Sequence, residues 1–266
     1  MQIAVFGMTD VGRRREKNED AYLINTSQNL YIVADGMGGH LGGEIASKMA
    51  VATVEEIIME LMQDPDMTLQ ANIDVRPNDF KGYLRYAISS ASNKIYDKSA
   101  HDPSLHGMGT TIVTTIFQKG KIYLAHVGDS RCYLLRDGKI KQLTQDHSLI
   151  TEQLQAGVIS SADVRNHKLK NIITRSVGFQ EDVDTDIIMK GTKVGDKFLL
   201  CTDGLTNMVT TDDLVSILSS NSPREACVAL IDLANKNGGD DNVTVIVTEV
   251  LDSEGAPLGE EDTVGI

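Results

Sequence analysis

The sequence predicts an α+β protein built from antiparallel sheets and amphipathic helices. Three observations support this prediction. Nine short apolar runs have the composition of strands, some consecutive runs are joined by two-residue turns, and helical periodicity occurs in blocks rather than in strict βαβ alternation. The 266 residues are 41% hydrophobic and 24% charged. Such a chain is long enough to bury a core and too apolar to be disordered.

The expected strands are runs of β-branched, aromatic and aliphatic residues bounded by turn formers. They are Ile3–Phe6, Ala21–Ile24, Leu30–Ala34, Thr111–Phe117, Lys121–His126, Arg131–Leu135, Asp186–Met189, Lys197–Cys201 and Val243–Val250. The dipeptides Lys119-Gly120 and Asp137-Gly138 are typical of hairpin turns, so the runs on either side of each are expected to pair in antiparallel fashion.

Three helices are expected between and after these strands. Two of them show apolar residues at helical spacing. The first carries Ile45, Met49, Val54, Ile57, Ile58 and Leu61, and the second carries Phe80, Leu84, Ala87, Ala91 and Ile95. The third begins at Ser222-Pro223-Arg224-Glu225, a capping box with proline at the first helical position, and is ended by Gly238-Gly239.

The chain is acidic throughout, with 25 basic and 38 acidic residues and a formal net charge of −13. Residues 252–266 contain five acids and no base, so we expect a single domain over residues 1–251 and a flexible acidic tail over residues 252–266. An acidic protein lacks the basic footprint that nucleic acids and anionic membranes require, which excludes both as main partners.

The three cysteines, Cys132, Cys201 and Cys227, are too far apart in sequence for a C-x-x-C metal site and form no disulfide framework. No apolar run approaches the roughly 20 residues of a membrane span, and the charged N-terminal segment is not a secretory signal. We therefore expect a cytoplasmic protein without membrane insertion.

Acidic residues cluster at the ends of expected strands or beside glycines. The five clusters are Asn18-Glu19-Asp20, Asp35-Gly36-Met37-Gly38-Gly39, Gly128-Asp129-Ser130, Thr202-Asp203-Gly204 and Gly238-Gly239-Asp240-Asp241-Asn242. Each one alone is most simply a turn. Turns by themselves give no reason for the acid to recur at strand ends, so the five together predict a shared cavity lined by oxygen ligands. Such a cavity suits Mg²⁺ or Mn²⁺ rather than Zn²⁺.

Other catalytic motifs are absent or poorly placed. The glycines after Asp35 resemble a dinucleotide loop, but Leu41 occupies the third glycine position and the acid would repel a pyrophosphate. Asp64-Pro65-Asp66-Met67-Thr68 matches an aspartyl-phosphate motif, yet a helix is expected before it where a strand is needed. No cysteine is followed six residues later by arginine, and the histidines show no zinc-binding H-x-x-x-H pair.

The order of the motifs resembles the metal-dependent protein phosphatase family of type 2C, in particular its short bacterial members. The resemblance spans about residues 5 to 250. The matching segments are Arg15-x-x-Asn18-Glu19-Asp20, Asp35-Gly36-Met37-Gly38-Gly39-His40, Gly109-Thr110-Thr111, Gly128-Asp129-Ser130-Arg131, Leu143-Thr144-x-Asp146-His147-Ser148, Ile173-Thr174-Arg175-Ser176-Val177-Gly178, Thr202-Asp203-Gly204-Leu205 and Asp240-Asp241-Asn242-Val243-Thr244.

This resemblance implies a four-layer sandwich of two antiparallel β-sheets, each flanked by a pair of antiparallel helices. It implies metal-dependent hydrolysis of phosphoserine and phosphothreonine in proteins by a water that bridges two Mn²⁺ or Mg²⁺ ions. The enzyme would be a monomer whose phosphoprotein substrates include a bacterial serine/threonine kinase that it opposes. The alternatives are a catalytically silent phosphoprotein-binding relative and an enzyme that acts on a partner-switching regulator of transcription.

The resemblance also implies a set of metal ligands. Asp35 would bridge both ions and the Gly36 carbonyl would bind one of them. Asp203 and Asp241 would complete the protein ligands of one ion, and Glu19 would help to hold the other. Asp20 would not bind an ion directly but would hold these ligands in place. Asp129, together with Asp203, would hold a possible third ion.

Further roles follow from the same comparison of motifs. Arg15 would bind the substrate phosphate, and residues 149–170, with Ser160 and Ser161, would form a mobile flap beside the site. Met37 stands where eukaryotic members have a histidine, and a thioether cannot protonate the leaving group. The proton is therefore expected from His40 or, by preference, from water at the third ion near Asp129. Asn207 stands where those members have an acid.

Overall fold

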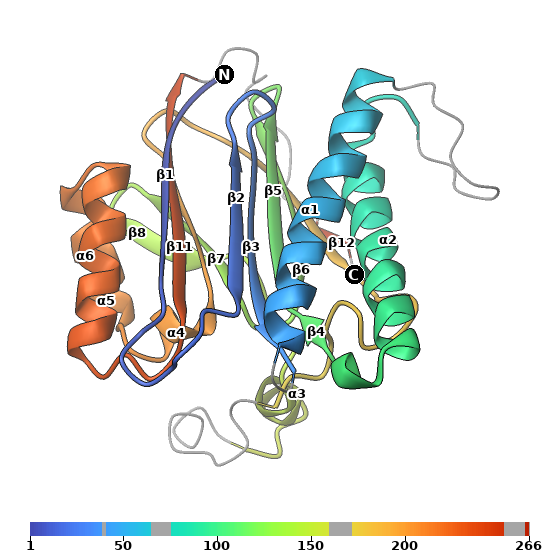
Figure 1. The fold of residues 1–266 in the computed structure, drawn as a ribbon. Helices are drawn as coiled ribbons and strands as arrows, with labels where there is room; N and C mark the ends of the chain where they lie inside the picture. Colours follow the sequence, from blue (N-terminus) through green and yellow to red (C-terminus); the bar gives the residue numbers. More distant parts are fainter. Residues whose placement is uncertain (39–40, 65–75, 160–171, 253–263, 266) are drawn as a thin grey trace.

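The computed structural model describes residues 1–38, 41–64, 76–159, 172–252 and 264–265 (Figure 1). Two antiparallel sheets face each other, and each is covered on its outer side by a pair of helices. The predicted four-layer α+β sandwich is therefore confirmed. Among the described residues, no helix has the length and hydropathy needed to cross a membrane.

The first sheet has five strands in the order β1-β11-β10-β7-β8. Their bounds are β1 Gln2–Asp10, β7 Arg131–Arg136, β8 Lys139–Gln142, β10 Lys197–Cys201 and β11 Val243–Asp252. The first and last long strands are neighbours, with Gln2 opposite Asp252 and Thr9 opposite Thr244.

The second sheet has the order β12-β9-β6-β5-β3-β2, with β4 paired to the end of β3. The bounds are β2 Asp20–Asn25, β3 Leu30–Met37, β4 Gly109–Thr110, β5 Ile112–Gln118, β6 Lys121–Val127, β9 Asp186–Gly191 and β12 Val264–Gly265. All nine expected strands are thus present, and β4, β8 and β12 are additions.

Both predicted hairpin turns are confirmed by their backbone angles. Lys119 and Gly120 have φ values of 51° and 73°, and Asp137 and Gly138 have values of 53° and 71°. Positive φ at both central residues is the geometry that matches the twist of a two-residue hairpin. The turns join β5 to β6 and β7 to β8.

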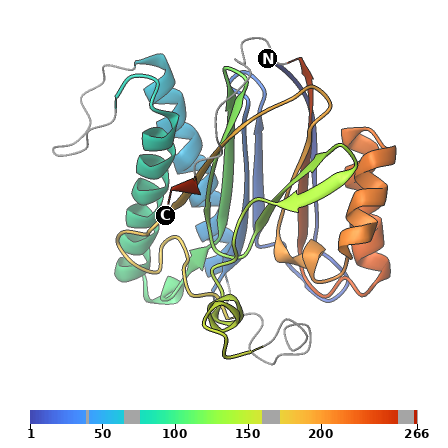
Figure 2. The same cartoon turned by 180° about the vertical axis from the view of Figure 1, so that it is seen from behind.

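The helices cover the outer faces of the sheets (Figure 2). The long pair, α1 Gly42–Gln63 and α2 Phe80–His101, packs on the second sheet, and α5 Thr211–Ser220 and α6 Pro223–Lys236 pack on the first. Three shorter helices are α3 Leu149–Gln155, α4 Asp203–Thr206 and the 3-10 helix η1 Pro103–Leu105. The predicted capping box is formed: the Ser222 hydroxyl accepts from the Glu225 N–H, and the Glu225 carboxylate accepts from Ser222.

Apolar side chains fill each of the three interlayer spaces. Between the sheets, the ring of Phe117 lies 5.8 Å from that of Tyr31 and 5.2 Å from that of Phe198. Burying a side chain of this size stabilises the fold by about 1.5–3 kcal/mol. The sandwich is therefore a rigid platform for the strand ends that carry the acids.

Three sequence segments discussed above lie wholly or partly outside the described residues. Asp64 follows α1 as its C-terminal cap, so the helix expected before it is present, while the rest of that motif falls in the undescribed residues 65–75. The described part of the predicted flap holds α3, whereas Ser160 and Ser161 are outside. Of the predicted tail, only Asp252 and β12 are described.

Candidate metal centre

Five aspartates from distant parts of the chain meet at one end of the sandwich. Asp20 begins β2 and lies directly opposite Asp35, near the end of β3. The pKa of Asp35 is raised well above its usual value by burial and by the neighbouring negative charges of Asp20, Asp203, Asp129 and Asp241. The structure thus brings together the acids that the sequence analysis singled out.

The backbone of Asp35 is held by two threonines, Thr110 at the end of β4 and Thr111 directly after it. Its N–H donates to the Thr111 hydroxyl at 3.0 Å, and its carbonyl accepts from the Thr111 N–H and the Thr110 hydroxyl, both at 2.8 Å. The Thr111 hydroxyl in turn contacts that of Ser130, beside Asp129, at 2.7 Å. This chain of hydrogen bonds links the positions of two of the acids.

Gly36 is a glycine because the start of α1 packs directly on it. A Cβ atom at this position would collide with the carbonyl of Gly43 and lie 2.6 Å from the carbonyl oxygen of Glu19. The Gly36 N–H donates to that Glu19 carbonyl at 3.2 Å. The carboxyl carbon of Glu19 would lie 2.9 Å from a Cβ at Gly43. Two predicted ligands, the Gly36 carbonyl and Glu19, therefore lie close to the first turn of α1.

Asp20 is buried behind this group and is oriented by two threonines. Its Oδ2 accepts from the hydroxyls of Thr202 at 3.0 Å and Thr244 at 2.6 Å, while its Oδ1 has no hydrogen-bond partner. Burial, opposed by these two hydrogen bonds and reinforced by the charges of Asp203 and Asp241, raises the pKa of Asp20 to about 7. A carboxylate held this way fits the supporting role implied by the resemblance.

Asp203 and Asp129 lie beside each other on loops that leave the two sheets. Asp203 begins α4, and its Oδ2 accepts from the Asn207 amide at 3.0 Å. Burial raises its pKa, and a hydrogen bond with the Asp35 carboxyl lowers it in part. Burial and the charge of Asp203 raise the pKa of Asp129 to about 7. The Oδ1 atoms of both residues are buried without a partner.

Arg15 and Asp241 lie at the more exposed edge of the cluster. The Arg15 guanidinium donates to Asp241 Oδ2 at 2.8 Å, and the charges of Glu19 and Asp35 also act on it. Its side chain is 52% exposed. The predicted phosphate-binding arginine is therefore paired here with a predicted metal ligand, at the mouth of the site and open to solvent.

Asn242 holds the loops of the cluster together, a role that the sequence analysis missed. Its side-chain oxygen accepts from the Glu19 N–H at 2.8 Å, and its amide group donates to the carbonyls of Val11 and Lys17 at 2.9 and 2.8 Å. The side-chain oxygen and the amide group of Asn242 are thus both hydrogen-bonded to protein atoms. The signal in the sequence is a polar amide between an acidic loop and a strand rich in valine.

His147 fixes the loop that carries Asp129. Its backbone N–H donates to the Gly128 carbonyl at 2.9 Å, and its Nδ1 accepts from the Gly128 N–H at 3.1 Å. This bond leaves the ring proton on Nε2, which faces Asp186 Oδ2 at 3.3 Å and the Arg175 guanidinium at 3.3 Å. The pKa of His147 is lowered, chiefly by burial, so the neutral ring is favoured.

His126, His147 and Asp186 have ligand atoms within 4.8 Å of one another, close enough for a cation. The two rings stack at 4.5 Å, and His126 Nε2 bonds to the Gln145 carbonyl. The proton on His147 Nε2 and the adjacent arginine both oppose a metal ion. This group is therefore a hydrogen-bonded support, in agreement with the structural role expected for the histidines.

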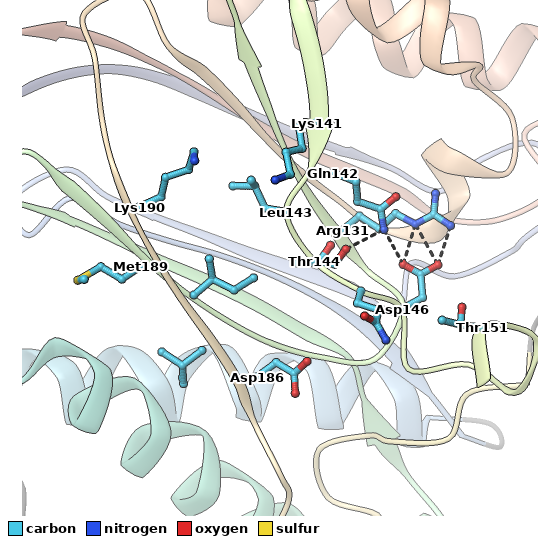
Figure 3. A pocket seen from close by; sticks show the side chains of 13 residues that line it. Arg131, Lys141, Gln142, Leu143, Thr144, Asp146, Thr151, Asp186, Met189 and Lys190 are labelled. Carbon is cyan, nitrogen blue, oxygen red and sulfur yellow. Dashed lines mark hydrogen bonds and ion pairs between the residues drawn. The ribbon is translucent and has the colours of Figure 1, made fainter. Parts of the chain in front are cut away.

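A cavity of about 560 Å³ lies behind this support, between β7–β8 and β9 (Figure 3). Arg131 forms a bidentate ion pair with Asp146 on one wall, at 2.6–3.0 Å, and Asp186 contributes to the other. None of the predicted metal ligands lines this cavity. The ion pair on its wall holds Asp146, the residue that precedes His147.

The donor set of the cluster is suited to divalent cations. Asp20, Asp129 and Asp203 each present a buried carboxylate oxygen without a hydrogen-bond partner, around an Asp35 whose ionisation is opposed by its neighbours. Buried carboxylates normally find a partner, and a partnerless cluster is stabilised by a cation. All the donors are oxygen atoms, the set that Mg²⁺ and Mn²⁺ prefer. The residues therefore fit the implied metals.

Comparisons with known proteins agree with this geometry. Residues 12–228 match the family model of protein phosphatase 2C. The chain is 39% identical over 245 residues to the serine/threonine phosphatase stp of Listeria welshimeri, an alignment that covers 91% of this chain and 93% of that protein.

Two solved structures are also similar. The Mycobacterium tuberculosis serine/threonine phosphatase PstP/Ppp matches with a TM-score of 0.83 and 31% identity, covering 94% of this chain and 99% of that one. A catalytic domain of PstP in complex with two manganese ions matches with a TM-score of 0.80 and 32% identity, covering 94% and 99%.

Proposed function

The chain belongs to the protein phosphatase 2C family and is a metal-dependent serine/threonine phosphatase, and we propose that the acids around Asp35 are its catalytic centre. The observation that carries this assignment is the set of three buried, partnerless carboxylate oxygens, on Asp20, Asp129 and Asp203, that surround Asp35. A protein does not concentrate such atoms in one place unless a cation offsets their repulsion.

In this proposal, Asp35, the Gly36 carbonyl, Glu19, Asp203 and Asp241 hold two Mn²⁺ or Mg²⁺ ions, and Asp129 with Asp203 offers a place for a third. When bound, the ions lower the pKa of a water molecule and neutralise the phosphate oxygens. Asp20 keeps the surrounding loops aligned through Thr202 and Thr244. The threonines behind Asp35 keep its carboxylate in place.

Arg15 binds the substrate phosphate in this scheme. A planar guanidinium offers two parallel N–H donors to a phosphate, which a lysine cannot match. Arg15 is at the mouth of the site and half-exposed, so it is within reach of an incoming phosphoprotein. If Asp241 holds a cation, its carboxylate would no longer be needed as the partner of Arg15, and the guanidinium would be free to donate to the phosphate.

Phosphoproteins are the substrates, and we propose that they include a serine/threonine kinase whose action the enzyme opposes. We further propose a cytoplasmic monomer with one catalytic domain over residues 1–251 and a separate acidic tail over residues 252–266. The net charge of −13 argues against nucleic-acid and anionic-membrane partners, and the position of all candidate ligands within one sandwich supports a single catalytic domain.

The test is release of phosphate from a phosphothreonine peptide. We expect EDTA to abolish turnover and Mn²⁺ to restore it better than Zn²⁺, because the donors are all oxygen atoms. Full turnover in excess chelator would contradict the two-metal centre. A protein that binds Mn²⁺ and the peptide by calorimetry but releases no phosphate would instead be the catalytically silent relative.

A further inference from the structure

A groove of about 440 Å³ opens beside the carboxylate cluster and is separate from it. Its lining includes Met37, two residues beyond Asp35, and the loop from Ile173 to Asp184. Met37 pairs with Gly109 in the short β3–β4 ladder that also holds the Asp35 carbonyl. In Figure 2 this loop runs between α3 and the lower end of α2, at the same end of the sandwich as the cluster. The groove therefore lies next to the proposed catalytic centre without sharing its acids.

The loop that forms the outer wall is pinned at several points. Val177 exchanges backbone hydrogen bonds with Thr110 at 2.8 and 3.0 Å. The Ser92 hydroxyl accepts from the Gly178 N–H and donates to the Gln180 carbonyl, both at 2.9 Å, and Ser89 donates to Asp182 at 2.7 Å. These bonds tie the loop to α2, so the wall is preformed. A ligand that binds in the groove therefore loses little free energy to the ordering of this loop.

Phe179 stands between two of these fixed points and is 65% exposed. An aromatic side chain on a fixed backbone loses little further entropy on binding, which makes such residues effective contacts in interfaces. Met37, Ile173 and Val183 continue the apolar surface into the groove. The groove therefore offers an apolar contact for an incoming side chain.

The rim of the groove is acidic. Asp182 and Asp184 line it, and the exposed Glu181 lies between Gln180 and Asp182 on the same loop. Among the described lining residues the one cation is Arg175, which is already engaged by Asp184 at 3.5 Å and Asp186 at 3.0 Å. The charge that remains is negative, which complements a basic side chain and repels an acidic one.

We propose that this groove binds the polypeptide that flanks the phosphorylated residue, with an apolar side chain against Phe179 and a lysine or arginine beside Asp182 and Asp184. The inference rests on the proposed function, because the groove needs a protein substrate in the adjacent centre. Its consequence is that this phosphatase selects phosphoproteins by the basic and apolar residues next to the phosphate.

The test compares phosphothreonine peptides on an alanine background in which one lysine, or one glutamate, is placed at each of the three positions on either side of the phosphothreonine. We expect lysine on one side to give a higher kcat/KM than glutamate by about two- to fivefold, the range of an exposed ion pair. The difference should lie mainly in KM, because the contact is made equally in the ground and transition states.

Two variants test the groove directly. Asp182→Asn with Asp184→Asn should remove the lysine preference, since the amide keeps the hydrogen-bonding oxygen and loses the charge. Phe179→Ala should lower the ratio of peptide to p-nitrophenyl phosphate kcat/KM by about five- to tenfold when an apolar residue flanks the phosphothreonine. The matched controls are Asp212→Asn on α5 and Val194→Ala, an apolar residue 62% exposed in the β9–β10 turn. Both controls should leave the preference and the ratio unchanged.

The outcomes separate the two proposals. The groove proposal alone would be overturned if the wild-type enzyme hydrolyses the peptides without a lysine preference and Phe179→Ala leaves the ratio of peptide to p-nitrophenyl phosphate kcat/KM unchanged. A wild-type enzyme that hydrolyses p-nitrophenyl phosphate but none of the peptides would overturn the proposed function itself.

Discussion

Asp35 is the residue on which the centre depends most. The charges of Asp20, Asp203, Asp129 and Asp241 all act on it and, together with burial, raise its pKa. We expect Asp35→Asn to lower kcat/KM by about 10³-fold or more, because it removes the charge that the two ions would share. Asp203→Asn and Asp241→Asn should also be severe. The measurement is phosphopeptide turnover together with Mn²⁺ binding by calorimetry.

Asp64 provides the control for that series. It caps the far end of α1 and belongs to the motif that matches aspartyl-phosphate enzymes. Asp64→Asn should leave turnover near the wild-type value, because no residue of the cluster contacts it in the described structure. An inactive Asp64→Asn enzyme would mean that a covalent phosphoenzyme, rather than the cluster, carries the reaction.

Asp129 should matter most when the leaving group is poor. A serine or threonine alkoxide needs a proton as the P–O bond breaks, and Met37 cannot supply it. We expect Asp129→Ala to lower phosphothreonine-peptide turnover by a larger factor than p-nitrophenyl phosphate turnover, since p-nitrophenolate leaves without protonation. His40, which lies outside the described residues, is the comparison. If His40→Ala selectively abolishes the peptide reaction, the proton comes from His40 instead.

Elements differ in how well the sequence predicts them. The long strands and the helices α1 and α2 were predicted because their periodicity extends over enough residues to be distinctive, and α6 was predicted from its capping box and its terminating glycines. β4 and β8 are too short to show a period, and α5 carries only Leu214 and Leu218 as buried apolar residues. Its capping box at Thr210 and Asp213 was the available signal.

The positions of single side chains were harder to predict than the elements. The acids of the cluster could be found because each lies near one end of a strand and adjoins a glycine or another acid. His147 and Asp186 could not, because their relation is a tertiary contact between segments 39 residues apart. The pairing of Arg15 with Asp241 could not be predicted either, because only the folded sandwich brings the two loops together.

The contact between the β6–β7 loop and the segment before α3 gives a prediction at the level of elements. His147 holds Gly128 through both its backbone and its ring, and Gly128 precedes Asp129. His147→Leu removes the ring acceptor, so it should reproduce the selective loss of peptide turnover that is expected for Asp129→Ala. His147→Asn places an oxygen near the Nδ1 position and should retain most of that turnover.

The comparison of these two variants separates positioning from general stability. Both lose the bond to Asp186, so their melting temperatures should fall by similar amounts, while the ratio of peptide to p-nitrophenyl phosphate turnover should differ. Equal ratios for Leu and Asn at position 147 would refute a role in positioning Asp129.

At the scale of the whole molecule, the buried acids make stability depend on pH and on metal. Burial raises the pKa of Asp20 and of Asp129 to about 7, against a value near 3.9 in an unfolded chain. Between pH 4 and 7 the unfolded chain therefore releases protons that the metal-free fold retains. The stabilising effect of these protons is complete below about pH 4 and is lost as the pH rises through about 7.

We expect Asp20→Asn to raise the melting temperature of the chelator-treated protein, and to raise it more at pH 7.5 than at pH 5. The comparison of variant with wild type is needed because burial lowers the pKa of His126 to about 4, which changes stability in the opposite direction below about pH 6.5. Mn²⁺ should stabilise the wild type more at pH 7.5, where it competes with fewer protons. A variant effect that is the same at both pH values would contradict this account.

The pairing of the first strand with the last has a consequence for the synthesis of the protein. β1 is completed by β11, the last long strand, and Asp241 and Asn242 stand just before it. A ribosome adds about 5–20 residues per second, so β1 remains without its neighbour β11 for tens of seconds while most of the chain is made. No nascent chain shorter than about 242 residues contains the complete cluster. We therefore expect chains that end before Asp241 to lack a complete metal centre and to release no phosphate from phosphoproteins.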